Sequence, residues 1–117
     1  MCVFCKIVNN ELPSNKVLED ENFLAFHDIN PSAPIHVLVI PKKHIENFQS
    51  VDSETMAKAT PFIQEVAKKL GLDKTGYRLV TNNGEDGGQE VFHLHFHILG
   101  GTKLKWHRYQ IDPKKAI

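Results

Sequence analysis

The most regular pattern of apolar and polar positions lies near the end of the chain, where residues 93–98 read His-Leu-His-Phe-His-Ile. Alternation of this kind predicts an extended strand, because successive side chains of a strand point to opposite faces. The three apolar residues should then face a core, while His93, His95 and His97 share the other face. Imidazoles two residues apart on a strand are separated by about 6.5–7 Å, so all three can serve one site.

Four other segments are predicted to be strands, because apolar and β-branched residues stand there between polar or proline-containing turns. They span residues 16–19, 23–27, 35–40 and 77–81. The polar residues 20–22 predict a hairpin between the first two strands, and Pro41 ends the third because proline cannot donate to a ladder. Residues 82–89 form a glycine-rich turn region, and Gly100 ends the histidine strand.

Helical spacing is confined to one stretch, which begins after the N-cap candidates Asp52 and Ser53. Small or apolar residues recur there at Met56, Ala59, Ile63, Val66, Ala67 and Leu70. Gly71 supplies the stop. Pro61 lies inside the pattern and removes one backbone hydrogen bond, so we expect it to kink or split the helix.

Strands and one long helix in this order predict the α+β class, with an antiparallel sheet of about five strands and one main helix packed on one face. The other face should remain free for chemistry or for a partner. A chain of 117 residues suffices for one compact domain. Residues 1–117 are therefore expected to form a single domain, with residues 107–117 as a C-terminal tail.

The charge balance excludes some partners. The chain has 14 Lys plus Arg and 14 Asp plus Glu, so it has no net charge with which to attract a nucleic-acid polymer. No apolar run approaches the roughly 20 residues that cross a bilayer, and the start of the chain lacks the apolar segment of a secretory signal. We therefore expect a soluble, cytoplasmic protein with neither a membrane nor a nucleic-acid partner.

Three histidines on one face allow three interpretations. They can be the polar face of an amphipathic strand, although such faces normally also use Lys, Glu, Thr and Ser. A His-x-His pair can hold a catalytic zinc ion with an open water position, or one imidazole can be a nucleophile that the others orient. Residues 93–101 carry no carboxylate to assist a metal, which favours the nucleophile. The glycine-rich residues 82–89 are suited to hold phosphate oxygens.

The same residues resemble a known family. Residues 91–101 match the His-x-His-x-His pattern of the histidine triad (HIT) superfamily. Further matches follow in family order at residues 26–29, 34–36, 39–44 and 86–89. The short chain, Gly100 and Gly101 after the triad, and Trp106 resemble the nucleotide-binding (Hint) branch. His97 in place of a glutamine argues against the uridylyltransferase branch.

The resemblance implies a purine nucleoside phosphoramidase or related nucleotidyl hydrolase without a catalytic cofactor. His95 would attack the α-phosphorus and form a nucleotidyl-histidine intermediate that water then cleaves. His97 and His36 would lie near the phosphate and the nucleophile. The implied partners are a purine nucleoside monophosphate, or its phosphoramidate or ester, and a second copy of the chain joined through the main helix and a sheet edge. A nucleotide-binding module without catalysis and, less favoured, a zinc hydrolase with histidine ligands are the alternatives.

The resemblance also implies substrate contacts. Asp28 would accept hydrogen bonds from the ribose hydroxyls, and a turn-starting aspartate is its structural alternative. Phe26 and Ile29 would line the base pocket. Asn82 and Gln89 would contact the phosphate and the leaving group.

Glu90 departs from the family pattern, because the Hint branch commonly has Ser or Thr at this place. An anion beside a phosphate is unfavourable. Either Glu90 turns away and only its backbone N–H contributes, or its carboxylate recognises a cationic leaving group such as lysine.

Cys2 and Cys5 are the only cysteines. A structural disulfide is not expected in a reducing compartment, and no strand precedes Cys2 as a thioredoxin-like motif requires. Four-coordinate zinc needs two further ligands. The resemblance implies a structural zinc site at Cys2, Cys5, His44 and His93, as in several bacterial members of the superfamily. Two ordinary thiols are the alternative.

Overall fold

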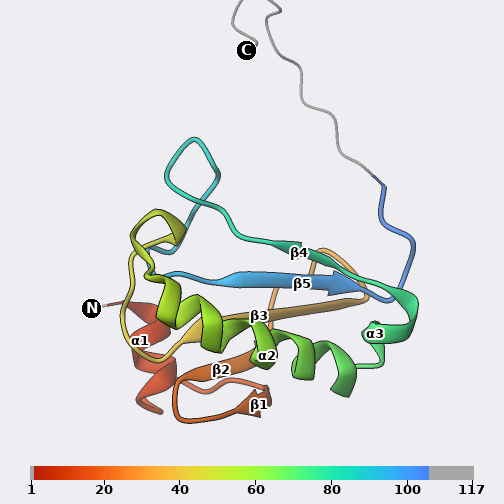
Figure 1. The fold of residues 1–117 in the computed structure, drawn as a ribbon, viewed down its shortest axis with the longest axis horizontal. Coiled ribbons are helices and arrows are strands. Elements are labelled where there is room, and N and C mark those ends of the chain that lie inside the picture. Colours follow the sequence, from red (N-terminus) through yellow and green to blue (C-terminus); the bar gives the residue numbers. More distant parts are fainter. Residues whose placement is uncertain (1, 106–117) are drawn as a thin grey trace, which may run out of the picture.

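The computed structural model describes residues 2–105, whose fold is drawn in Figure 1. Trp106 and the predicted tail at 107–117 lie outside the described residues. The elements follow the order α1, β1, β2, β3, η1, α2, α3, β4 and β5. None of the helices in the described residues is long and apolar enough to cross a membrane.

One five-stranded sheet forms the centre of the molecule. Its strands are β1 (Lys16–Glu19), β2 (Phe23–His27), β3 (Ile35–Pro41), β4 (Arg78–Val80) and β5 (Phe96–Gly100). They lie in the order β1-β2-β3-β5-β4, and every neighbouring pair is antiparallel. In the predicted hairpin, Asp20 Oδ1 accepts hydrogen bonds from the N–H groups of Asn22 and Phe23, each at 2.7 Å. The predicted α+β class is confirmed.

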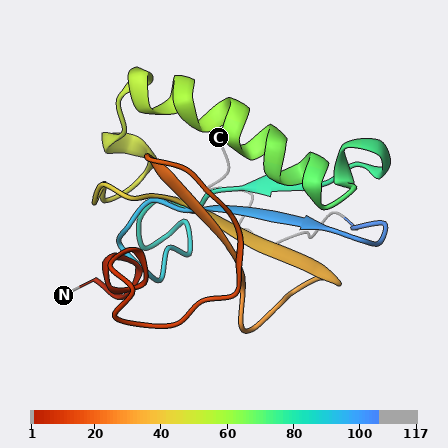
Figure 2. The same cartoon turned by 90° about the horizontal axis from the view of Figure 1, so that it is seen from below.

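The long helix α2 (Ser53–Lys69) covers one face of the sheet, as Figure 2 shows. Asp52 caps it by accepting a hydrogen bond from the Thr55 N–H at 2.8 Å. The larger core joins this helix to the sheet, and its buried residues include Phe23, Ala25, Val37, Val39, Ala59, Phe62, Ile63, Val66, Phe96 and Ile98. Two short helices, η1 (Phe48–Ser50) and α3 (Leu72–Thr75), precede and follow α2.

Pro61 does not split α2, which runs as one helix from Ser53 to Lys69, so the expected split does not occur. Both Pro61 and Ala57, whose carbonyl loses its usual partner four residues on, are exposed. Water can therefore satisfy that carbonyl, which lowers the cost of the missing hydrogen bond.

The other face of the sheet is not free, contrary to expectation, because the unpredicted helix α1 (Val3–Val8) packs on part of it (Figure 2). Phe4 and Ile7 of this helix are 7% and 9% exposed. They form a second core with residues of β2 and β3, namely Leu24, Phe26, Leu38 and Ile40. α1 therefore forms a second layer beside the histidines.

The histidine segment alternates as predicted, but only part of it is a strand. Leu94, Phe96 and Ile98 all lie in the core beneath α2. β5 begins at Phe96, so His93 and His95 precede it. The Leu94 N–H donates instead to the Ile45 carbonyl at 2.6 Å, which draws this stretch away from the ladder.

Candidate active site and metal centre

Two adjacent antiparallel strands bring His36 and His97 together. In the β3–β5 register His36 lies opposite Leu99 and Leu38 lies opposite His97, so the two histidines are diagonal neighbours on one face. His36 Nε2 and His97 Nδ1 are 2.9 Å apart, which is hydrogen-bond distance. The structure thus joins two residues that are 61 positions apart in the chain.

Backbone contacts determine which nitrogen of each ring carries a proton. The Ser32 N–H donates to His36 Nδ1 at 3.0 Å, so in the neutral ring the proton is on Nε2. That Nε2–H donates to His97 Nδ1, and Asp28 Oδ2 lies 3.4 Å away as a second neighbour. His97 in turn carries its proton on Nε2. The His97 Nε2–H is therefore left to donate a hydrogen bond to an anionic ligand.

In His95 the main chain places the proton on the other ring nitrogen, Nδ1. Its Nδ1 lies 2.7 Å from the His93 carbonyl oxygen, which can only accept, so Nδ1 carries the proton. In the neutral ring Nε2 then keeps a lone pair. His95 is 7% exposed rather than open to solvent, yet it lines two pockets. The strand face that was predicted to be free is thus largely covered at His95, which still borders both pockets.

Burial keeps the two paired imidazoles neutral near pH 7. It lowers the pKa of His36, against the opposing effect of Asp28. It lowers the pKa of His97 to about 4, with smaller contributions from His95 and His36. A neutral His97 is consistent with the hydrogen-bond pattern, which requires its Nδ1 to accept.

Two adjoining pockets meet at the histidines. One has a volume of about 420 Å³ and is mainly apolar, with walls from α1, β2 and β3. The other has a volume of about 300 Å³ and is mainly polar. The residues that line both pockets are Asp28, Glu90, His95 and His97. The imidazoles therefore stand between a space suited to an apolar ring and a space suited to a polar group.

Several of the predicted site residues line these two pockets. Phe26, Asp28 and Ile29 line the apolar pocket, and Ile29 is 91% exposed at its rim. His36 and Asn82 line the polar pocket. Sequence reasoning missed the contribution of α1, whose Val3, Phe4 and Ile7 form part of the apolar wall.

Gln89 lines neither pocket, although the family resemblance implied that it contacts the substrate. It is 5% exposed. Its Oε1 accepts from the Gly84 N–H at 2.8 Å, and its Nε2 donates to the Glu46 and Val91 carbonyls at 2.8 and 3.0 Å. Both amide hydrogens are used inside the protein. This side chain holds the glycine-rich loop and has no free donor for a ligand.

Close approach fixes the shape of the same loop. A Cβ at Gly87 would lie 2.4 Å from the Asn83 carbonyl oxygen, so only glycine fits there without a backbone shift. Asn82 Nδ2 donates to the Gly87 carbonyl at 2.7 Å and closes the turn. Asn82 and Gly88 of this loop both line the polar pocket.

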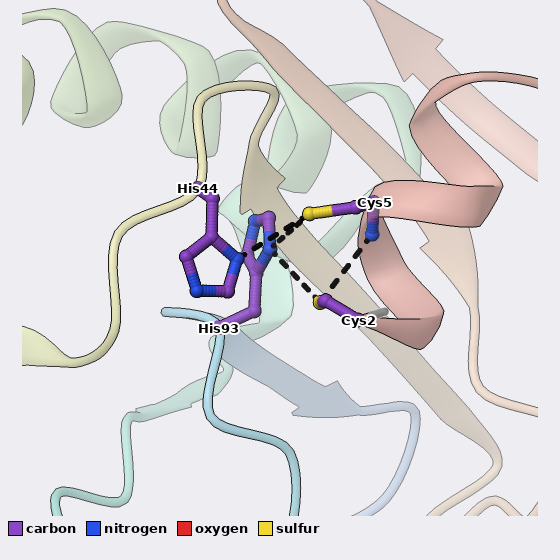
Figure 3. A group of neighbouring side chains, drawn as sticks. All are labelled: Cys2, Cys5, His44 and His93. Carbon is purple, nitrogen blue, oxygen red and sulfur yellow. Dashed lines mark hydrogen bonds between the residues drawn. The ribbon is translucent and has the colours of Figure 1, made fainter.

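A second cluster joins both cysteines to two histidines (Figure 3). Cys2 Sγ lies 3.3 Å from His93 Nδ1. Cys5 Sγ lies 3.3 Å from His44 Nδ1 and 3.5 Å from His93 Nδ1. The four ligand atoms all lie within 4.8 Å of one another. α1, the segment after β3 and the segment before β5 each contribute to it, so the fold assembles the predicted set.

The donor set fits a tetrahedral metal ion. In a tetrahedron, bond lengths of about 2.3 Å to sulfur and 2.0–2.1 Å to nitrogen imply ligand separations of roughly 3.3–3.8 Å. The sulfur to nitrogen distances above lie close to that range. His93 Nε2 donates to the Pro41 carbonyl at 2.8 Å, which leaves Nδ1 as the ligand atom. Burial and the neighbouring Cys2 raise the pKa of the Cys5 thiol, and a cation among these ligands would offset both effects.

Comparison with known proteins identifies relatives along most of the chain. Residues 9–104 match the model of the HIT domain family. An uncharacterized HIT-like protein of Helicobacter pylori is 55% identical over 103 residues, which cover 88% of this chain and 99% of that relative.

Solved structures agree with this match. A crystal structure of a HIT family hydrolase from Legionella pneumophila is 48% identical, with a TM-score of 0.87 over 91% of this chain and 97% of that one. A histidine triad nucleotide-binding protein from Candida albicans is 33% identical, with a TM-score of 0.80 over 98% and 89% of the two chains.

The low pKa of His97 predicts a loss of stability in acid. The unfolded chain takes up a proton near the usual pKa of 6.5, whereas folded His97 resists protonation until about pH 4. The contribution is therefore intact above pH 6.5 and is lost as the pH falls from 6.5 toward 4. We measure the free energy of unfolding in urea at pH 7.5 and at pH 4.5, with equal zinc content in both proteins. Between these two pH values, the unfolding free energy of His97→Gln should fall by on the order of 1–2 kcal/mol less than that of the wild type. An equal loss in both proteins would contradict this assignment.

Proposed function

This chain belongs to the HIT domain family, and from this premise we propose that it is a nucleotide-binding hydrolase of the nucleoside phosphoramidase type. The observation that carries the proposal is the hydrogen bond from His95 Nδ1 to the His93 carbonyl. It fixes the tautomer that a histidine nucleophile needs, and it does so at the junction of two pockets. The similarity to a HIT family hydrolase of Legionella and to a histidine triad nucleotide-binding protein of Candida supports the hydrolase and nucleotide-binding parts of the proposal.

The substrate we propose is a purine nucleotide that carries an amine or an ester on its phosphate. The apolar pocket, lined by Phe4, Phe26 and Ile29, would take the base. Asp28, which lines both pockets, would accept hydrogen bonds from the ribose hydroxyls. The phosphate would then lie against His95 and His97, with the leaving group toward Asn82 and Gly88.

The reaction balances without a metal ion. His95 Nε2 would form a bond to phosphorus while the bond to the amine breaks, and the leaving amine takes up one proton from solvent. The resulting phosphorylated ring is cationic and keeps its Nδ1–H on the His93 carbonyl, which stabilises that charge. His97 Nε2–H would donate to a phosphate oxygen in both steps. Water then attacks phosphorus, the bond to His95 breaks, and one proton returns to solvent.

A second candidate function rests on a different observation. Asp28, His36 and His97 each place a ligand atom within 4.8 Å of the others, a set that can hold a divalent metal ion. A metal there would displace the proton that His36 donates to His97. The zinc hydrolase thus requires this hydrogen bond to break, whereas the nucleophilic reaction uses it. A module that binds nucleotides without turnover remains the third alternative.

Glu90 is the proposed determinant of the leaving group. Its exposed carboxylate lines both pockets beside His95 and His97, and the described residues lining the polar pocket include neither Lys nor Arg. An anion at this place disfavours the substrate phosphate unless the leaving group carries a positive charge. We therefore propose that the leaving group is cationic, such as lysine.

We also propose that Cys2, Cys5, His44 and His93 hold a structural zinc ion. The donor types and distances support it, as does the hydrogen bond that orients His93. Four protein ligands leave no open position for water, so this ion would stabilise the fold and take no part in the reaction.

A homodimer is the proposed assembly. β4 is an edge of the sheet, and its other side is unpaired in the described part of the chain. Leu79 on this strand and Tyr77 before it are 47% and 38% exposed. An uncovered apolar edge invites another strand, and a second copy of the chain would cover it beside α2.

Turnover of an adenosine phosphoramidate distinguishes the three functions. We expect release of the amine that resists EDTA added during the assay, and a nucleotidyl adduct on His95 after acid quenching. His95→Asn should lower kcat by at least about a thousandfold. Glu65→Gln, on the exposed side of α2, is the control variant. No release would favour the binding module, and immediate loss of activity in EDTA would favour the metal hydrolase.

Leaving-group preference tests the role of Glu90. We expect Glu90→Gln and Glu90→Ser to lower kcat/KM for a lysine phosphoramidate and to raise it for a neutral amine of the same length. An exposed charge supports a change of about two- to fivefold in each direction. An unchanged ratio between the two substrates would remove Glu90 from specificity.

Metal content tests the zinc site. Protein purified without chelators should contain one zinc per chain, and Cys5→Ser should lose most of it. Removal of zinc by EDTA should lower the melting temperature, because the free energy of metal binding contributes to folding. Zinc-free protein, or a melting temperature that EDTA leaves unchanged, would defeat the proposal.

A further inference from the structure

His93 belongs to both the metal centre and the active site. Its ring nitrogen Nδ1 faces the cysteines, and its carbonyl oxygen holds His95 Nδ1 at 2.7 Å. The residue is fully buried, and its remaining ring nitrogen donates to the Pro41 carbonyl at 2.8 Å. A displacement of this residue at the metal centre would therefore also displace the carbonyl that orients His95.

Helix α1 is the second connection between the two sites. It has six residues, too few to be a stable helix by itself, so its position depends on what it contacts. Cys2 caps its first turn, with Sγ accepting from the Cys5 N–H at 3.4 Å, and both thiols belong to the metal centre. Between them in sequence, Val3 and Phe4 line the apolar pocket.

Phe4 touches both histidines directly. Its ring centre lies 5.8 Å from that of His93 and 5.1 Å from that of His95, edge to face in each case. It also contacts Phe26 in the pocket wall, with ring centres 5.8 Å apart. The side chain that α1 places beside the nucleophile is thus fixed by the same turn that carries the thiols.

We infer that metal binding at Cys2, Cys5, His44 and His93 is energetically coupled to nucleotide binding, with Phe4 and the His93 carbonyl as the positioning groups. A filled metal centre holds α1 against the sheet, and so holds the pocket wall and His95 in the arrangement that binds the nucleotide. This inference rests on the proposed function and deepens it. It differs from a purely structural role, in which zinc stabilises the whole fold without changing the pocket.

Coupling of this kind must be reciprocal. If zinc tightens nucleotide binding by some factor, then the nucleotide tightens zinc binding by the same factor. Typical couplings between sites are about 5- to 150-fold. Zinc and AMP affinities therefore give two independent measurements of one quantity, and neither requires turnover.

The first experiment measures the AMP dissociation constant by calorimetry for zinc-loaded and zinc-free protein. The temperature is chosen so that circular dichroism shows the same folded signal in both forms. We expect zinc-free protein to bind AMP at least about fivefold more weakly. Equal affinities would overturn the coupling while leaving the proposed function intact. Failure of zinc-loaded protein to bind AMP would instead count against the nucleotide site itself.

A second experiment applies if the zinc-free chain does not stay folded. A chelator then competes for zinc in the presence and absence of AMP, with each protein held at the same multiple of its own AMP dissociation constant. Because AMP binds the folded chain, it protects zinc to some extent simply by favouring folding. In the wild type we expect AMP to protect zinc by more than this amount. Phe4→Leu should lose this excess.

Val66→Ala is the matched control for loss of stability. Val66 is fully buried in α2, on the face of the sheet opposite the histidines. We expect this variant to lower the melting temperature and to keep the wild-type protection of zinc. Equal protection in wild type, Phe4→Leu and Val66→Ala would show that zinc acts only on global folding, and the inference would fail.

Discussion

The hydrogen bond from His95 Nδ1 to the carbonyl of His93 is the contact on which the candidate site depends. An imidazole can act as a nucleophile only through a nitrogen without a proton, and either nitrogen can lose it in solution. A carbonyl two residues earlier removes that freedom, because the oxygen can only accept. The chain reaches this geometry by leaving the ladder before β5, since a residue held in a regular strand would direct the same carbonyl to a neighbouring strand.

The other two imidazoles of the candidate site show how an antiparallel sheet sets proton positions at a distance. The register of β3 and β5 brings His36 to His97, and the Ser32 N–H then determines the tautomer of both rings. Burial on this face disfavours an imidazolium, which keeps the pair neutral. The fold thus supplies a lone pair at His95 and an N–H at His97 within one site, and the residues from 2 to 105 that line its two pockets include neither Lys nor Arg.

Local signals explain what the sequence predicted well. The bounds of β1 and β2 agree with the segments 16–19 and 23–27, because turn residues flank both. α2 agrees within a residue at each end, since a long periodic stretch and an N-cap leave few alternatives. The triad histidines and Asp28 were assigned to one candidate site through the family resemblance. Those predictions needed only local chemistry or a known motif.

What the sequence did not reveal depends on contacts between distant segments. α1 is too short to show a helical period, and its cap is a cysteine, so only its packing on β2 and β3 identifies it. Gln89 reads as a polar residue free to meet a ligand, yet the Glu46 carbonyl, 43 positions away in the chain, takes one of its hydrogens. His93 is likewise buried by distant segments, since its ring packs against Phe4 and His44 and contacts the Pro41 carbonyl.

The groups that orient the rings of His36, His93 and His95 have a common origin, because the donor at Ser32 and the acceptors at Pro41 and His93 are all main-chain atoms. Replacing the side chain at such a place does not delete the atom that matters. Divergence or engineering can therefore alter the side chains at residues 32 and 41 while the tautomers stay fixed. Moving the proton of one of these rings to its other nitrogen would require a different backbone path, reached by an insertion, a deletion or a new glycine in the loop. The backbone path is therefore what a redesign must change.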